Sequence, residues 1–182
     1  TKTSVASLLA SLYPEAHGVR GIEDVLPETA LLLSEVFQRN GYHTLKVHGN
    51  PWMLQRFGFV QGYDETIYRD GTNGTVHAVE VAKHTLRWID AGGSQPFFAY
   101  VHYMDVHDPY QPPPEFATFG ETPRDTYAGG IRFWDGEFEK FFWALEQRQL
   151  TQNTWVVWTP DHGAAVRHHH RLPPRPGHHA VH

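Results

Sequence analysis

Residues able to do chemistry are concentrated at three places in the chain. The first residues, Thr1–Ser4, are rich in hydroxyls and stand just before a helix-like pattern. Residues 102–110 contain two histidines and two aspartates within nine positions. Residues 161–163 read Asp-His-Gly. Hydroxyl, imidazole and carboxylate groups serve as nucleophiles, as proton donors and acceptors, and as metal ligands.

The hydroxyls at the start of the chain have two explanations. Thr3 or Ser4 can cap the helix that follows, since a side-chain oxygen satisfies a free N–H of the first turn. Alternatively, the helix N-terminus presents free N–H groups and a positive dipole end to an anion. A hydroxyl held there can attack a phosphorus or sulfur centre. Position would give Thr1 that role.

The other two clusters also have plain alternatives. Each polar residue of the 102–110 cluster can be a surface loop residue or a turn cap, although Pro109 and the prolines at 112–114 stiffen the loop that carries His107. Asp161 and His162 can each offer one ligand to a divalent ion, and Gly163 lets a backbone approach closely. By itself, the tripeptide is more often a turn.

The segments between these clusters alternate in periodicity, as in an α/β layer fold. Helical spacing of apolar residues predicts helices over 4–12, 27–39, 75–90 and 127–149. Strands are expected over 43–48, 97–101 and 155–158. Polar clusters follow the second and third of these strands. Open parallel sheets bind ligands outside the carboxyl ends of their strands, so we expect the site at that edge.

Composition excludes several classes of function. The 182 residues fit one globular domain, and no apolar run approaches the roughly 18 residues of a membrane span. A formal charge of −5 argues against a nucleic-acid partner. The absence of cysteine removes disulfides, thiolate zinc sites and cysteine nucleophiles, but it predicts no localisation.

The last residues differ from the rest. Residues 164–182 are rich in histidine, proline and arginine and lack a hydrophobic period. We expect this tail to be disordered, or to follow a lost reading frame after Gly163; metal binding by its histidines is a further alternative. Because Thr1 opens directly into a helical pattern, we expect the chain, whose regular pattern covers residues 1–163, to be a fragment of a longer protein.

Several blocks, in order, resemble the sulfatases of the alkaline phosphatase superfamily. The blocks are 1–9 with 12–19, 41–44, 58–64, 107–110, Tyr127 with Ile131 and Asp135, and 154–157 leading into 161–163. The resemblance implies a three-layer α/β/α sandwich with a mostly parallel central sheet, incomplete at both ends of this chain. It also implies metal-dependent hydrolysis of a sulfuric or phosphoric ester through a covalent intermediate at Thr1.

The resemblance also implies roles for single residues. Asp161 and His162 match a pair of metal ligands, and an Asp-Asp pair would lie upstream of Thr1. One or two divalent ions are expected, with Zn²⁺ or Mn²⁺ favoured by the Asp-His pair and Ca²⁺ possible. His107 matches the histidine that contacts the anionic group or the leaving oxygen. The expected substrate is a small-molecule, lipid or glycan ester of sulfate or phosphate.

Three departures from the family pattern keep alternatives open. Sulfatases have, at the position of Thr1, a cysteine or serine that is converted to formylglycine. Relatives with threonine there, such as nucleotide pyrophosphatases and lipoteichoic acid synthases, use the hydroxyl directly in phosphoryl or phosphodiester chemistry. Val5 and Asn50 stand where an arginine and a lysine are expected, so two contacts to the oxyanion are missing. Lys2 can supply one charge, with Asn50 beside it as a substrate-binding residue.

The third alternative is a catalytically inactive, truncated remnant. It is motivated by the absent Asp-Asp pair, by Val5 and Asn50, and by the unusual tail. For the chain as given, we expect weak metal binding and negligible turnover.

Overall fold

The computed structural model describes residues 1–69 and 78–164. Three parallel strands form its sheet, in the spatial order β2-β1-β3. They are β1 (His43–His48), β2 (Glu65–Tyr68) and β3 (Phe97–His102). In the register of the central strand, Leu45 lies opposite Glu65 on one side and opposite Ala99 on the other.

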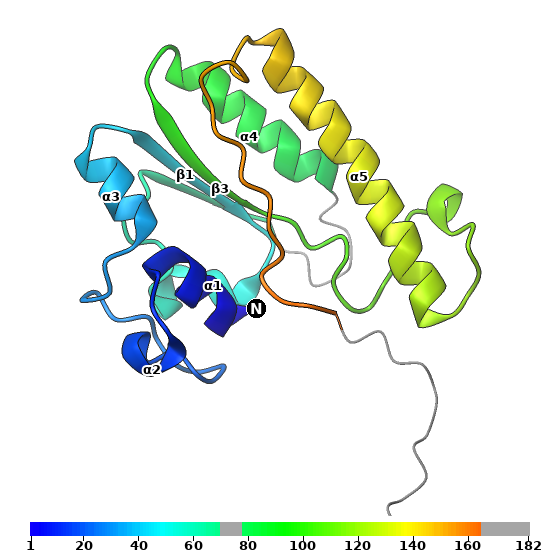
Figure 1. Cartoon of the computed structure of the whole chain (residues 1–182), viewed down its shortest axis with the longest axis horizontal. Helices are drawn as coiled ribbons and strands as arrows, with labels where there is room; N and C mark the ends of the chain where they lie inside the picture. Colours follow the sequence, from blue (N-terminus) through cyan, green and yellow to red (C-terminus); the bar gives the residue numbers. More distant parts are fainter. Residues whose placement is uncertain (70–77, 165–182) are drawn as a thin grey trace, which may run out of the picture.

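Helices cover both faces of this sheet (Figure 1). One layer contains α1 (Lys2–Ala10), α2 (Pro14–His17) and α3 (Leu33–Arg39), and the other contains α4 (Ala78–Gly92) and α5 (Pro123–Gln147). Short 3₁₀ turns η1 (Pro51–Met53), η2 (Gln55–Phe57) and η3 (Pro114–Phe116) lie in the connections. The predicted α/β/α layers with a parallel sheet are therefore confirmed.

Alternation along β1 divides the interior into two cores. Leu45 and Val47 are fully buried against α4 and α5. Successive strand residues point to opposite faces, so Thr44, Lys46 and His48 face the layer that contains α1. The second core lies on that side and joins α1 to the loops before and after β1.

The predicted helices are present with shifted boundaries. The second helix begins at Leu33 rather than at residue 27. The fourth begins at Pro123, where Thr122 and Asp125 form a capping box, rather than at residue 127, and it ends at Gln147. In the third helix, residues 78–92 are helical, and positions 75–77 fall outside the described residues. No helix in the described ranges is long and apolar enough to cross a membrane.

The strand expected over 155–158 is wrong. This segment is extended but carries no strand assignment, and Trp155 is 95% exposed and Val157 82% exposed. An apolar run becomes a strand when a neighbouring strand accepts its backbone hydrogen bonds, and none of the three described strands pairs with it. The expected tail, residues 164–182, lies outside the described residues except for Ala164.

A lysine is buried in the middle of β1. Lys46 is fully buried, and its ammonium donates hydrogen bonds to the carbonyl oxygens of Met53 and Phe59. Burial lowers the pKa of Lys46 to about 7. Its side chain thereby ties the loop after β1 to the sheet.

This lysine should make stability depend on pH. Between pH 7 and about 10.5, the unfolded chain holds the Lys46 proton more tightly than the folded chain, so the free energy of unfolding rises with pH in that window. In the wild type, the free energy of unfolding should rise by about a few kcal/mol over this window, and Lys46→Met should abolish that rise. Denaturant unfolding at several pH values measures it. Lys83→Met, at an exposed position of α4, is the control; the same rise in the wild type and in both variants would contradict the prediction.

Candidate active site

Thr1 lies at the N-cap of α1, and its hydroxyl does not cap the helix. The helix begins at Lys2, and no side-chain hydrogen bond caps it, so the alternative of capping by Thr3 or Ser4 is not observed. Instead, the Thr1 hydroxyl lies 3.1 Å from Nε2 of His162. Figure 1 shows the N-terminus beside the last described segment of the chain. The fold thus brings together two of the three sequence clusters, 161 residues apart.

His162 has a second contact, through its other ring nitrogen. Its Nδ1 lies 2.9 Å from the carbonyl oxygen of Gly163, which can only accept a hydrogen bond, so Nδ1 carries a proton. In the neutral ring, Nε2 then has a lone pair that faces the Thr1 hydroxyl. That lone pair can accept the hydroxyl proton or bind a metal ion, but not both at once.

The neighbouring carboxylate, Asp161, has one oxygen in use and one unsatisfied. Oδ1 accepts a hydrogen bond from the backbone N–H of His162 at 3.0 Å. Oδ2 is buried, accepts no hydrogen bond within the described residues, and lies 3.9 Å from the Thr1 backbone nitrogen and 3.5 Å from His162 Nε2. A buried carboxylate oxygen without a hydrogen bond, beside an imidazole nitrogen, suits a divalent cation. The Asp161–His162 pair therefore fits the metal predicted from the sequence.

The donor set is nevertheless a pair. Among residues 1–69 and 78–164, no group of three or more histidine, cysteine or acidic side chains is placed to hold a metal ion. The Thr1 hydroxyl, 3.1 Å from His162 Nε2, is a further oxygen beside the pair.

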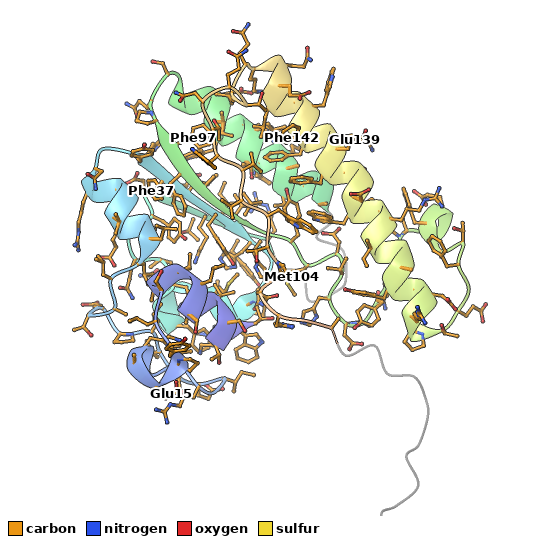
Figure 2. The ribbon with its side chains drawn as sticks, in the orientation of Figure 1. Glu15, Phe37, Phe97, Met104, Glu139 and Phe142 are labelled. Atoms are coloured by element: carbon orange, nitrogen blue, oxygen red, sulfur yellow. The ribbon has the colours of Figure 1, made fainter. Side chains whose placement is uncertain are left out.

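A pocket of about 530 Å³ opens beside Thr1. Its lining includes four of the six predicted site residues: Thr1, Lys2, Asn50 and His107. The loop that follows β3 and leads to η3 forms one wall, and Met104 at its start is labelled in Figure 2. The pocket lies past the carboxyl ends of β1 and β3, where the sheet rule places a ligand.

His107 belongs to this loop, and one of its ring nitrogens is bonded within it. Its Nδ1 lies 2.5 Å from the Asp108 carbonyl oxygen, so Nδ1 carries a proton and Nε2 is the nitrogen left to meet a ligand. Its own backbone N–H donates to the carbonyl of Met104 at 2.9 Å. The imidazole is exposed at the pocket, as a group that meets a substrate must be.

Lys2 lines the pocket, but its charge is already engaged. The side chain is buried, and Nζ donates to the carbonyl of Ile22 at 2.6 Å and lies 3.5 Å from the centre of the Phe57 ring. Burial lowers the pKa of Lys2, although Glu23 and Asp24 oppose this. The lysine thus joins the start of α1 to the loop at 20–22 in addition to facing the pocket.

Asn50 and Val5 occupy the positions where cationic residues were expected. The Asn50 side chain accepts a hydrogen bond from the Trp52 backbone N–H at 2.9 Å and so caps η1. The backbone carbonyl oxygen of Asn50 lies 2.9 Å from Nδ1 of the buried His48 ring. Val5 is fully buried in the core. Asn50 therefore contributes to the pocket wall without a charge, and Val5 contributes nothing to it.

Other residues of the pocket were not predicted. Arg20 and Trp52 both line it. The Asp24 carboxylate accepts hydrogen bonds from the backbone N–H groups of Arg20 and Gly21, at 2.8 and 2.6 Å, and these bonds lower the pKa of Asp24. The sequence signal for this turn is the spacing of Gly21 and Asp24, because an aspartate can accept hydrogen bonds from backbone N–H groups a few residues away.

His102, at the end of β3, interacts with the charge of the Asp161 carboxylate. Burial lowers the pKa of His102 to about 4, although Asp161 raises it. Its Nδ1 lies 3.1 Å from the Tyr100 hydroxyl. His102 is thus a neutral part of the interior behind the site.

A second hydroxyl–imidazole pair shows the contrast with Thr1 and His162. Ser7 Oγ lies 2.9 Å from Nε2 of His17. The Nδ1 of His17 accepts a hydrogen bond from the Val19 N–H, so Nε2 carries the proton and donates it to Ser7. His17 is 1% exposed and cannot take the serine proton. This pair stabilises the turn after α1.

Comparisons with known proteins show the family of the chain. A model of the sulfatase family matches residues 1–181. The chain belongs to the sulfatase family. One characterised relative is an N-acetylgalactosamine-6-O-sulfatase of Bacteroides thetaiotaomicron, 26% identical over 126 residues, which are 69% of this chain and 23% of that protein.

Solved structures show the same fold. The crystal structure of Ps i-CgsB matches with a TM-score of 0.64 at 19% identity. The match covers 83% of this sulfatase-family chain and 45% of the Ps i-CgsB chain. The crystal structure of the lipoteichoic acid synthase LtaP of Listeria monocytogenes has a TM-score of 0.65 at 15% identity, covering 82% and 40%. An alkaline phosphatase superfamily protein of Vibrio parahaemolyticus is also similar, with a TM-score of 0.60. The chain spans about a quarter of the characterised relative and under half of these structures.

Proposed function

We propose that the protein containing this chain hydrolyses a sulfuric or phosphoric ester with the Thr1 hydroxyl as its nucleophile. The observation that carries the proposal is the 3.1 Å contact between Thr1 Oγ1 and an imidazole nitrogen whose lone pair faces it. A hydroxyl is a weak nucleophile until a neighbouring base or cation favours its ionisation. Membership in the sulfatase family supports ester hydrolysis as the reaction class.

The Asp161–His162 pair would hold the divalent cation of this reaction. The buried Oδ2 of Asp161 and Nε2 of His162 would be its ligands from this chain. When bound, the ion lowers the pKa of a coordinated hydroxyl and polarises the ester. Zn²⁺ or Mn²⁺ suits a carboxylate and an imidazole better than Ca²⁺ does.

The chain's own residues then have separate tasks. The Thr1 hydroxyl loses its proton, and its oxygen forms the bond to phosphorus or sulfur while the bond to the leaving oxygen breaks, which gives a covalent ester on Thr1. Attack of water on that ester then releases the phosphate or sulfate product and restores the hydroxyl. His107 lines the same pocket and, with a proton on Nε2, would stabilise the charge of the transferring group or protonate the leaving oxygen. Lys2 and Asn50, which also line the pocket, would contribute to binding.

Removing the His107 imidazole should slow the reaction strongly. His107→Ala removes a charge-stabilising or proton-donating group, and such groups contribute about 10²- to 10⁴-fold. The measurement is kcat and KM of the full-length protein. His17→Ala is an unsuitable control because that ring is buried, so His84→Ala, on α4, serves instead; a kcat unchanged by His107→Ala would remove the residue from the mechanism.

A second candidate function is phosphoryl transfer to or from a lipid or polymer head group. Threonine at the nucleophile position favours it, because the hydroxyl acts directly and needs no conversion. The structural likeness to the lipoteichoic acid synthase LtaP is consistent with the same fold serving such chemistry. A third possibility, a protein without catalysis, follows from Val5 and Asn50 at positions expected to be cationic.

One assay separates the three. The full-length protein is given an aryl sulfate, an aryl phosphate monoester and a bis-aryl phosphodiester, each with Zn²⁺, Mn²⁺ or Ca²⁺ in turn. Preference for the sulfate supports a sulfatase, and preference for the phosphodiester supports the phosphoryl candidate. No metal-dependent turnover of any substrate would refute both.

A further inference from the structure

The loop that carries His107 rests on two glycines of α5. Residues 103–113 and the turn η3 run along the N-terminal part of this helix (Figure 1). At the contact, Gly129 and Gly130 are both buried, although they lie inside a 25-residue helix. Glycine is a weak helix former, so two in succession within a long helix call for a local reason.

Close approach of the loop backbone supplies that reason. A Cβ atom on Gly129 would lie 2.6 Å from the carbonyl oxygen of Phe116 and 3.0 Å from Cγ of Pro112. On Gly130, it would lie 3.1 Å from the carbonyl oxygen of Asp105. The obstructing atoms at the shortest distances are backbone atoms, which cannot rotate away as a side-chain end can.

The third glycine of the same helix differs. A Cβ atom on Gly136 would meet nothing within 4 Å. The requirement for glycine is therefore local to the two positions beneath the loop. Ring contacts flank them, since Phe133 packs on Phe116 with centroids 5.3 Å apart and Tyr127 on Tyr110 at 5.1 Å.

We infer that Gly129 and Gly130 are positioning residues that seat the 103–116 loop and thereby hold His107 at the pocket. Asp105 and Pro112, which the two glycines touch, both line the pocket and lie on either side of His107 in the chain. Any added side chain at Gly129 must lift this wall. The catalytic consequence rests on the proposed function, whereas the seating of the loop does not.

The experiment compares Gly129→Ala, Gly130→Ala and Gly136→Ala in the full-length protein. Hydrogen exchange across residues 105–117 reports on the loop, where the amides of His107 and Phe116 donate to Met104 and Pro113 at 2.9 and 2.8 Å. We expect exchange to increase most for Gly129→Ala, less for Gly130→Ala and not at all for Gly136→Ala. The melting temperature of Gly136→Ala should rise, since alanine favours the helix.

Turnover should follow the same order. A displacement of about 1 Å near a reacting group can cost about 10²-fold, so kcat should fall by about that factor for Gly129→Ala, with a smaller change in KM. Loss of folded protein would instead reduce the amount of active enzyme and leave KM unchanged. The order of the three kcat values separates a seated loop from a general defect.

Each outcome decides the inference. Equal exchange in the loop for all three variants, or equal kcat in an active protein, would overturn it. If Gly129→Ala does not fold, Gly130→Ala with its looser contact provides the comparison with Gly136→Ala. If the wild-type protein shows no turnover, the proposed function fails, and the exchange data still decide whether the glycines seat the loop.

Discussion

Thr1→Ala should reduce kcat of the full-length protein by at least about 10³-fold, because it removes the atom that forms the covalent bond. The Thr1 hydroxyl makes no capping bond to α1, so the substitution should leave the melting temperature close to that of the wild type. The loss should therefore appear in chemistry rather than in folding. Steady-state kinetics and thermal unfolding on the same preparations measure the two effects.

Thr1→Ser is the matched control for this variant. It keeps a hydroxyl at the same backbone position and removes only a methyl group, so it should retain most of the activity that Thr1→Ala loses. A Thr1→Ala protein with near wild-type kcat would show that the hydroxyl is not the nucleophile.

The second large effect is expected at the metal pair. Asp161→Asn keeps an oxygen that accepts from the His162 N–H but removes the charge of the buried Oδ2. His162→Ala removes the lone pair that faces Thr1. Each change should weaken Zn²⁺ or Mn²⁺ binding and lower kcat by more than the about 10- to 100-fold typical of residues that only support a ligand. Metal content after dialysis and kcat are the measurements.

Asp90→Asn is the control for the loss of charge. Asp90 pairs with Arg148 between α4 and α5, at 2.7 Å, and lies outside the pocket beside Thr1. Its substitution should change neither metal content nor kcat. If Asp161→Asn binds the metal as tightly as the Asp90 variant does, the pair is not a metal site.

The elements that the sequence predicted well are those whose burial shows in their composition. β1 alternates around Leu45 and Val47, and β3 is a continuous apolar run, so both could be recognised. β2 was missed because Glu65–Tyr68 is short and mixed, and its pairing with β1 sets its structure. A strand that depends on its neighbour leaves little trace in its own residues.

The apolar run at 155–158 shows the reverse case. Its composition is that of a buried strand, but in this structure no described strand pairs with it and its tryptophans are exposed. The polar residues that follow it lie beside Thr1, with His162 Nε2 3.1 Å from the Thr1 hydroxyl. Composition alone could not predict the hydrogen bonding of the segment before them.

The candidate site was predictable in its reactive groups and not in its supports. Thr1, His107 and the Asp161–His162 pair could be proposed because their side chains carry distinctive chemistry. The engagement of Lys2 by the Ile22 carbonyl could not, since any residue offers a carbonyl and only the fold brings this one within 2.6 Å. The same holds for the glycines under the His107 loop, which the sequence alone marked only as weak points of a helix.

The most direct test of the central claim is to trap the covalent intermediate. The full-length, metal-loaded protein is mixed with bis(p-nitrophenyl) phosphate, quenched in acid within one turnover, and its peptides are examined by mass spectrometry. We expect one nitrophenyl-phosphoryl group on the peptide that begins at or contains Thr1, absent in Thr1→Ala and reduced in Asp161→Asn. Turnover of the substrate with no label on Thr1, or with the label on another residue, would contradict the assignment of Thr1 as the nucleophile.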